Sequence, residues 1–268
     1  MRLIRGVLVD LDDTLYPQAE FLDQAWRAVA AFGATRGLDA DALLGALREE
    51  TAAGPAGGGL IDRALDRLGA AAAHLPALRA AFRAVSPEPL TPYPGVVRAL
   101  NRLRGRVPVG LVTDGEVAGQ RRKLAALGMV DAFDTVVFSD LAGPARGKPH
   151  PAPFRAALDD LGLPAAEVVM IGDHPDQDAA GAVAAGMPAV RVLTGEHAAR
   201  PDHPGTWLRA SCFAAAVCTL LPHLVADPRR EPFVERPLDE LGSGPPTAPL
   251  AVPRQVRRRV RPMSGVDA

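Results

Sequence analysis

The sequence has few cysteines and no long hydrophobic run. Its two cysteines, Cys212 and Cys218, lie six positions apart in one expected helix, so they would face different sides. They provide neither a disulfide framework nor a CxxC metal pair, which suits a reducing cytoplasm. The apolar run at the amino terminus stops at Asp10, and no stretch approaches the ~20 apolar residues of a membrane span. We expect a soluble, cytoplasmic protein with no membrane partner.

A charge excess of one sign is also lacking. The 268 residues carry a formal net charge of -1, which argues against a general electrostatic affinity for nucleic acid or anionic membranes. No nucleic-acid partner is therefore expected. Hydrophobic residues make up 48% of the chain and charged residues 23%, which is ordinary for a globular protein.

Lysine is rare. Lys123 and Lys148 are the two lysines among 30 basic residues, and the other 28 are arginines. The bias is what genome composition would produce, but in such a chain a lysine can mark a position that requires a compact ammonium group. We predict this of Lys148. Lys123 is predicted to lie on the polar side of its helix, where replacement by arginine would have no effect.

The chain divides into three regions by its pattern. Strand-like apolar runs alternate with helical patterns in residues 1–16 and 90–226, which indicates an α/β domain with a doubly wound parallel sheet. Residues 17–89 show helical periodicity without strand alternation, so we predict an inserted domain of four helices. Residues 227–268 are rich in proline and arginine, the composition of a disordered tail.

The expected elements of the α/β region follow one another closely. Strands are expected in the apolar runs at 6–9, 107–112, 136–138, 168–171 and 189–193, the last being the final strand. Helices are expected at 96–103, 120–127, 153–161, 178–185 and 211–224. A proline-rich stretch, residues 87–94, would close the helical insertion.

The most informative stretch is residues 6–16, an apolar run that turns abruptly acidic. Asp10, Asp12 and Asp13 would emerge at the carboxyl end of a buried parallel strand, where ligands collect in open α/β sheets. Three such carboxylates repel one another unless a cation lies among them, and a hard divalent metal is the natural partner. Taken alone, the same stretch could be an acidic turn that caps a helix.

Four segments place polar groups at a strand end or in an adjoining loop. They are Asp10-Leu11-Asp12-Asp13-Thr14, Leu111-Val112-Thr113-Asp114-Gly115, Gly147-Lys148-Pro149 and Gly172-Asp173-His174-Pro175-Asp176-Gln177-Asp178. In this order and spacing they resemble motifs I to IV of the haloacid dehalogenase-like (HAD) hydrolase superfamily. The helical insertion resembles the C1 cap of that superfamily, and residues 113–121 resemble a phosphatase-like subgroup. The resemblance implies a Rossmann-like HAD core with an inserted helical cap domain.

Phosphate-ester cleavage needs a nucleophile, a proton donor for the leaving alkoxide and positive charge around the phosphoryl oxygens. Asp10 is the best candidate for the nucleophile, and the resemblance implies that it forms an aspartyl-phosphate. Asp12 would protonate the leaving group and then activate water for the second step. The resemblance also implies a tight turn after Asp10, which the sequence alone does not show.

Two further residues would bind the phosphoryl group. Thr113 would offer its hydroxyl to a phosphoryl oxygen, and Lys148 would neutralise charge on Asp10 and on the phosphate. Asp114 would border the same phosphate site. These residues complete the predicted set that contacts the substrate phosphate.

The resemblance implies a Mg²⁺ cofactor. Asp10, Asp173 and the backbone carbonyl of Asp12 would hold the ion, and Asp178 would be either a further metal ligand or a residue that orients Lys148. Oxygen ligands alone, at a phosphate site, favour Mg²⁺ over zinc.

Each residue also has a purely structural interpretation. Thr113 could simply end a strand, Lys148 could be a solvated lysine, and Asp178 could cap the helix that follows. His174 precedes a proline and is assigned no catalytic role. The agreement of four separate motifs favours the catalytic interpretation.

Other functions share part of the pattern. A receiver-like signalling domain would lack Asp12, the large insertion and the second acidic motif at Asp173, and a haloacid dehalogenase would lack Asp12. A phosphomutase shares all four motifs and stays an alternative. We therefore predict a Mg²⁺-dependent phosphatase, a phosphoric monoester hydrolase that acts on a small phosphorylated metabolite such as a sugar phosphate or nucleotide. The sequence leaves the substrate and the oligomeric state open.

Overall fold

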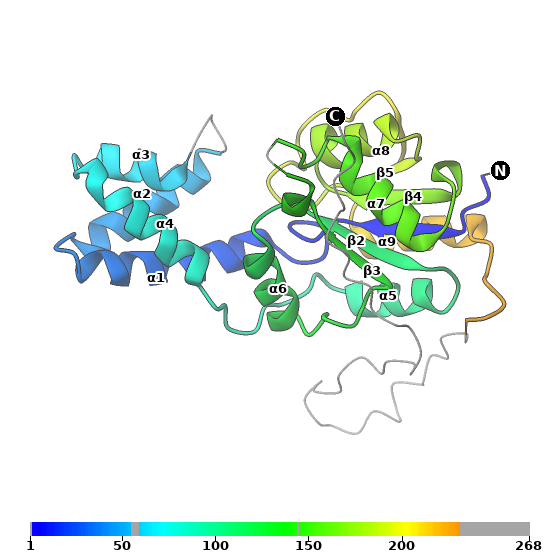
Figure 1. Ribbon diagram of the computed structural model, residues 1–268, viewed down its shortest axis with the longest axis horizontal. Helices are drawn as coiled ribbons and strands as arrows, with labels where there is room; N and C mark the ends of the chain where they lie inside the picture. Colours follow the sequence, from blue (N-terminus) through cyan, green and yellow to red (C-terminus); the bar gives the residue numbers. More distant parts are fainter. Residues whose placement is uncertain (1, 55–58, 144, 231–268) are drawn as a thin grey trace, which may run out of the picture.

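A parallel sheet with a helical unit to one side of it forms the structure (Figure 1). The computed structural model describes residues 2–54, 59–143 and 145–230. In these residues the sheet has six strands in the order β3-β2-β1-β4-β5-β6. They are β1 (Gly6–Val9), β2 (Val109–Thr113), β3 (Thr135–Phe138), β4 (Val168–Gly172), β5 (Ala189–Val192) and β6 (Thr206–Ala210). All neighbouring pairs are parallel, which confirms the predicted α/β class.

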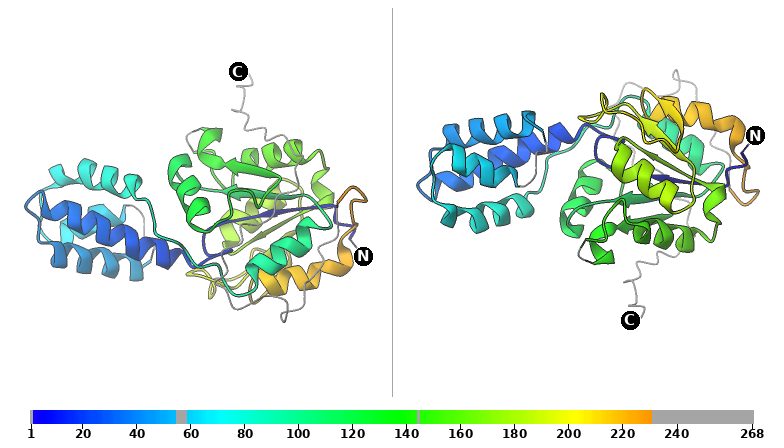
Figure 2. Two further views of the ribbon diagram at one scale, coloured as in Figure 1. Left: turned by 90° about the horizontal axis from the view of Figure 1, so that it is seen from below. Right: turned by 90° about the horizontal axis from the view of Figure 1, so that it is seen from above.

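Helices cover both faces of the sheet because the strands are apolar on both sides. Val7 and Val9 of β1 belong to a core shared with residues of α5 (Val96–Arg104), α6 (Val117–Ala126) and α9 (Phe213–Leu220). Leu8 belongs to a second core, shared with α7 (Pro151–Leu161) and α8 (Ala180–Ala184). Figure 2 shows α5 and α9 side by side on one face of the sheet. The side chains of β1 are buried on both faces of the sheet, as expected for a central strand.

The helical unit is inserted between β1 and α5. It consists of α1 (Gln18–Ala34), α2 (Ala40–Ala52), α3 (Leu60–Arg67) and α4 (Leu75–Ala84). Trp26, Leu43 and Leu47 lie in an apolar core of its own, and the ring of Trp26 stacks on that of Phe82 with 5.0 Å between centroids. We call this unit the cap. The predicted helical insertion is confirmed, although residues 55–58 of its glycine-rich loop lie outside the described residues.

Two predictions about the elements are wrong. Residues 189–193 do not hold the final strand, because β6 pairs with β5 at the edge of the sheet. This strand was missed because its five residues, which are partly buried or exposed, do not form the apolar run that marks an inner strand. The helix expected at 178–185 also differs, since Pro175–Ala179 form a π-helical turn and α8 begins at Ala180.

The first residues of the predicted tail contact the core. The N–H of Asp227 donates to the carbonyl of Arg106 at 2.7 Å, and the guanidinium of Arg230 pairs with Asp134 at 2.8 Å. The folded region therefore continues beyond residue 226, while residues 231–268 lie outside the described residues. None of the helices in 2–54, 59–143 and 145–230 combines the length and apolar character that crossing a membrane requires.

Candidate active site

Three neighbouring strands deliver polar side chains to one edge of the sheet. Asp10 follows β1, Thr113 ends β2 and Asp173 follows β4. Their carboxyl ends meet because β1 lies between β2 and β4 and all three run parallel. The N–H of Asp10 donates to the carbonyl of Ile171 at 3.0 Å, so strand pairing extends to the residue itself. The side chains of Asp10, Thr113 and Asp173 are all buried.

The chain turns tightly directly after Asp10. Asp13 adopts a φ of 54°, in the left-handed region that few residues other than glycine occupy. The loop after β5 lies against this turn so closely that a Cβ at Gly195 would come within 2.2 Å of Cγ of Asp13. The turn takes Asp12 out of the sheet, where it meets a set of partners different from those of Asp10.

Lys148 is buried between two carboxylates. Its Nζ lies 2.5 Å from Oδ1 of Asp10 and 2.7 Å from Oδ1 of Asp178. Burial lowers the pKa of Lys148, but the charges of Asp10, Asp178 and Asp114 outweigh it and raise this pKa above its ordinary value. A charged ammonium group is therefore fixed beside Asp10.

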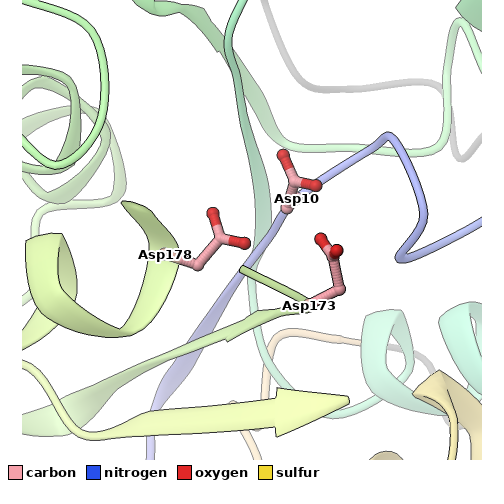
Figure 3. A group of neighbouring side chains, drawn as sticks. All are labelled: Asp10, Asp173 and Asp178. Carbon is pink, nitrogen blue, oxygen red and sulfur yellow. The ribbon is translucent and has the colours of Figure 1, made fainter. Parts of the chain in front are cut away.

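Three buried carboxylates gather at this position, from the ends of β1 and β4 and from the π-helical turn (Figure 3). Asp10, Asp173 and Asp178 each offer an oxygen, and these oxygens lie within 4.8 Å of one another. Burial, together with the neighbouring carboxylates, raises the pKa of Asp10 and that of Asp173 above their ordinary values, although Lys148 opposes both shifts. A divalent cation would relieve this repulsion, and oxygen donors alone fit Mg²⁺.

Asp178 also holds the segment after β4 in place. Its Oδ2 accepts a hydrogen bond from the N–H of His174 at 3.0 Å, while its Oδ1 accepts from Lys148. A Cβ at Gly172 would lie 2.2 Å from that Oδ2, so only glycine leaves room for the carboxylate. The interpretation of Asp178 as only a helix cap does not hold, because its side chain reaches back to residue 174 and across to Lys148.

Asp12 is held by three donors on other parts of the chain. Its carboxylate accepts hydrogen bonds from the hydroxyl of Tyr16 (2.5 Å), from Nε2 of Gln120 (2.9 Å) and from Nζ of Lys123 (2.7 and 3.0 Å). Burial raises the pKa of Asp12, but Lys123 and these hydrogen bonds outweigh it and lower the pKa below its ordinary value. Its carboxylate is not part of the cluster formed by Asp10, Asp173 and Asp178.

The prediction that Lys123 lies on the polar side of its helix is wrong. Its side chain is 7% exposed and forms an ion pair with Asp12. Its ammonium group also lies 4.5 Å from the ring centre of Phe21, which belongs to the first turn of α1 in the cap. The sequence of α6 has few large apolar residues and therefore no evident inner face, so periodicity gave no sign that residue 123 points inward.

Thr113 and Asp114 have protein partners that order the site. Oγ1 of Thr113 accepts a hydrogen bond from Nε2 of Gln120 at 2.6 Å, and the same amide reaches Asp12. Asp114 accepts hydrogen bonds from the N–H of Lys148 at 3.1 Å and from the hydroxyl of Ser139. The Asp114 carboxylate thus holds the segment that carries Lys148, and a contact with phosphate stays a prediction.

Several side chains for which the sequence predicted no role take part in the site. The hydroxyl of Thr14 lies 3.4 Å from Oδ2 of Asp10 and 3.5 Å from Oδ1 of Asp173. Others contact Asp12 or Asp114, namely Tyr16, Gln120, Lys123 and Ser139. The rarity of lysine was a signal that could have found Lys123. Thr14 and Gln120 lie in stretches that carry the family resemblance, and Tyr16 ends the acidic stretch at residues 6–16, but no role was predicted for them. No signal marked Ser139, whose partner is set by packing.

A cleft of about 800 Å³ lies between the cap and the core. Gln18 and Leu22 of α1 contribute to its wall, and Asp13, Tyr93 and Glu196 contribute from the core. The cleft therefore opens beside the turn that follows Asp10. Both units shape the space next to the cluster of carboxylates.

Comparisons with known proteins agree on one family. The family model for haloacid dehalogenase-like hydrolases matches residues 4–186. Among curated proteins, a glyceraldehyde 3-phosphate phosphatase of Methanocaldococcus jannaschii is 32% identical over 203 residues, covering 73% of this chain and 87% of that protein. A phosphoserine phosphatase of Thermus thermophilus is 36% identical over 191 residues, covering 70% and 71%.

Solved structures show the same fold. A HAD phosphatase from Thermococcus onnurineus gives a TM-score of 0.56 at 23% identity, covering 81% of this chain and 98% of that one. A HAD hydrolase from Bacillus subtilis, bound to magnesium, gives 0.60 at 18% identity, covering 82% and 100%. The chain belongs to the haloacid dehalogenase-like hydrolases. It is therefore an enzyme of the hydrolase class.

Proposed function

We propose that this chain is a Mg²⁺-dependent phosphatase that hydrolyses a small phosphorylated metabolite through an aspartyl-phosphate intermediate. The observation that carries the proposal is the separation of two nearby aspartates by their partners. Asp10 contacts Lys148 at 2.5 Å, whereas Asp12 is held by Tyr16, Gln120 and Lys123. Their separate partners allow two different roles: Asp10, beside the ammonium group of Lys148, would be the nucleophile, and Asp12, outside that contact, would exchange protons with the ester oxygen and with water.

In the first step, an oxygen of Asp10 attacks the phosphorus atom, and the bond between phosphorus and the ester oxygen breaks. Asp12 gives its proton to that oxygen, which leaves as an alcohol. Lys148 neutralises the charge that gathers around Asp10 and the phosphoryl group. The hydroxyl of Thr113 accepts from Gln120, which leaves its own hydrogen for a phosphoryl oxygen.

In the second step, the phosphoryl group moves from Asp10 to water. Asp12, now a carboxylate, takes a proton from a water molecule while the water oxygen attacks phosphorus. The bond between phosphorus and the Asp10 oxygen breaks, which regenerates the Asp10 carboxylate and releases inorganic phosphate. Asp12 is thereby protonated again and ready for the next ester.

The residues proposed to hold Mg²⁺ are Asp10, Asp173, Asp178 and the backbone carbonyl of Asp12. The fit rests on three buried carboxylates with oxygens within 4.8 Å of one another. When bound, the ion would supply positive charge for the phosphoryl oxygens and the attacking carboxylate. Asp178 also accepts from Lys148 at 2.7 Å, so orienting this lysine is a second role open to it.

The substrate is proposed to be a small phosphorylated metabolite. The relatives named above act, by their names, on glyceraldehyde 3-phosphate and phosphoserine, which are both small. The cleft beside Asp13 would receive the part of the substrate that lies beyond the phosphate. The cytoplasmic location expected from the sequence stays a prediction.

A panel of phosphate esters tests the proposal. Sugar phosphates, nucleotides, phosphoserine and an aryl phosphate would be assayed for inorganic phosphate, with Mg²⁺ and with excess EDTA. We expect turnover of panel members with Mg²⁺ and none above background in EDTA or with Asp10→Asn. Full activity in EDTA would remove the metal from the mechanism, and wild-type rates for Asp10→Asn would remove the nucleophile.

The same assay separates hydrolysis from phosphoryl transfer within a substrate. A phosphatase releases one inorganic phosphate for each alcohol formed. A phosphomutase would instead return an isomeric phosphate ester with little free phosphate. We expect equal amounts of alcohol and inorganic phosphate.

A further inference from the structure

Lys123 is buried where three elements meet. It belongs to α6 of the core, and its ammonium group contacts both oxygens of Asp12, in the turn after β1, at 2.7 and 3.0 Å. It also lies 4.5 Å from the ring centre of Phe21 in α1 of the cap. A buried cation needs partners that replace its water, and Asp12 and the face of the Phe21 ring supply them.

A second residue of α6 acts on the same carboxylate. Gln120 lies three positions before Lys123, so both side chains project from one face of the helix. Gln120 donates to Oδ2 of Asp12 at 2.9 Å, and Tyr16 donates to Oδ1 at 2.5 Å. Donors to both oxygens prevent the carboxylate from rotating. Its orientation is therefore set by α6 and by the turn itself.

The contact with Phe21 extends this arrangement to the cap. Phe21 is 6% exposed and packs in the apolar core that contains β1, although it belongs to a cap helix. Its ring also meets the ring of Phe82 in α4 edge-on, with 6.0 Å between centroids. The ring of Phe21 therefore contributes both to the contact between the cap and the core and to the position of Lys123.

We propose that Lys123 is a positioning residue of the reaction. By contacting both oxygens of Asp12 and the ring of Phe21, it holds Asp12 where the ester oxygen departs and ties that position to the seating of the cap. The inference rests on the proposed function, because it requires Asp12 to be the proton donor. It requires no contact between Lys123 and the substrate.

The step that depends on this position is the proton transfer to the leaving oxygen. A proton passes from the Asp12 carboxyl group to the ester oxygen, and the electron pair of the breaking bond to phosphorus stays on that oxygen. p-Nitrophenolate is a weak base and leaves with little help, whereas phenolate is more basic and needs the proton more. Misplacing Asp12 should therefore slow phenyl phosphate more than p-nitrophenyl phosphate.

The test compares these two esters in Lys123→Met, which removes the charge and keeps the chain length. We expect kcat/KM, which reports the first step alone, to fall by about 10²-fold for phenyl phosphate and by a factor at least about ten times smaller for p-nitrophenyl phosphate. Arg121→Met is the matched control, since it removes an exposed cation from the same helix, 5.6 Å from the ring centre of Phe138. Both rates of this control should stay within about twofold of wild type.

A double-mutant cycle shows whether Lys123 acts through Asp12. In the Asp12→Asn background, adding Lys123→Met should change kcat for p-nitrophenyl phosphate by less than about twofold, because the group that it positions is already gone. A large further loss there, or equal losses of kcat/KM on the two esters in the single variant, would overturn the proposal. Phe21→Leu keeps Lys123 and Asp12. We expect it to slow phenyl phosphate more than p-nitrophenyl phosphate, but by smaller factors than Lys123→Met does. Equal effects of Phe21→Leu on both esters would remove the proposed link to the cap.

The two esters distinguish a failure of the proposed function from a failure of the inference about Lys123. If the wild-type enzyme hydrolyses neither ester, the proposed function fails and the inference fails with it. If the wild-type enzyme hydrolyses both and the dependence on the leaving group is missing in Lys123→Met, only the inference about Lys123 fails.

Discussion

At the scale of single residues, the two lysines of the chain each contact one aspartate of the first motif. Lys148 lies 2.5 Å from Asp10 and Lys123 lies 2.7 Å from Asp12. Both are buried, in a chain whose other 28 basic residues are arginines. A compact ammonium group fits beside closely spaced carboxylates, whereas the planar guanidinium of arginine needs more room. Lys123 and Lys148 therefore occupy positions that require a small, point-like cation.

Lys148→Arg tests this requirement at the nucleophile. Arginine keeps the charge, but its longer side chain would displace Asp10 or the phosphate, so we expect turnover to fall by about 10²–10³-fold with an unchanged circular dichroism spectrum. Arg155→Lys, the reverse exchange at an exposed position of α7, should stay within about twofold. A loss of less than about threefold for Lys148→Arg, below ~1 kcal/mol of barrier, would make Lys148 dispensable.

Asp173→Asn tests the proposed metal site without an activity assay. Asparagine keeps the shape of the side chain and removes one charge from a buried cluster. In EDTA we expect the variant to melt about 2–4 °C above the wild type, since about 1 kcal/mol of repulsion is relieved. Added Mg²⁺ should raise the melting temperature of the wild type and of Asp41→Asn, an exposed control in α2, but not that of Asp173→Asn. An equal response to Mg²⁺ in all three proteins would contradict the assignment.

The sequence predicted the residues that end the strands better than it predicted their supports. The positions of Asp10, Thr113 and Asp173 at strand ends could be predicted because an apolar run indicates a strand and a polar residue marks its end. The contact between Lys123 and Asp12 spans 111 positions and depends on how α6 packs beside the turn after β1. The left-handed conformation of Asp13 is also invisible in sequence, since it is imposed by neighbours rather than by a glycine.

At the scale of elements, the loop between β5 and β6 supports the turn after β1. The N–H of Glu196 donates to Oδ2 of Asp13 at 3.4 Å, and the hydroxyl of Thr194 donates to the Asp13 carbonyl. Arg191 of β5, fully buried, donates to the carbonyls of Asp173 at 3.2 Å and of Arg200 at 2.6 Å. Strand β5 and the loop that follows it thus steady both the segment that carries Asp173 and the turn that carries Asp12.

Gly195→Ala should disturb this support, and Gly37→Ala is its matched control. Both glycines have positive φ, 69° and 84°, but a Cβ at Gly195 would overlap Asp13 whereas nothing lies within 4 Å of one at Gly37. Each substitution costs about 1–2 kcal/mol for the left-handed backbone. We expect urea unfolding to show a larger loss for Gly195→Ala, and turnover to fall only in that variant. Equal effects of the two substitutions on stability and turnover would show that the loop does not support the site.

Helices and strands could be predicted from the sequence where the spacing of apolar residues followed one clear period. The cap helices α1 and α2 carry apolar residues at helical spacing, and their predicted type is confirmed. The edge strand β6 was missed because its residues are half-buried and include Trp207 beside the charged Arg209, so neither a continuous apolar run nor a clean alternation marks it.

At the scale of the whole molecule, the cap and the sheet have separate apolar cores that meet near the site. Trp26 and Leu47 lie in the core of the cap, while Phe21 packs with the core of the sheet. The cleft between the two units opens beside Asp13. Substrate selection and positioning of the proton donor would then both depend on how the cap is seated.

Two truncations test where the folded region ends. A chain that stops after Arg230 keeps the ion pair with Asp134 and the bond from Asp227 to Arg106, so its melting temperature should match that of the full chain. A chain that stops after Ala226 loses both contacts and should melt about 2–4 °C lower. Identical melting temperatures for the two would show that residues 227–230 contribute nothing to stability.

The central claim is that Asp10 carries the phosphoryl group during turnover, and covalent trapping tests it most directly. Asp12→Asn keeps the nucleophile but lacks the proton acceptor for the second step, so phospho-enzyme should accumulate with p-nitrophenyl phosphate and Mg²⁺. Rapid acid quenching, proteolysis and mass spectrometry would then locate the phosphate. We expect phosphate on Asp10 and none when Asp10→Asn is added, whereas phosphate on another residue, or on none, would contradict the role of Asp10 as nucleophile.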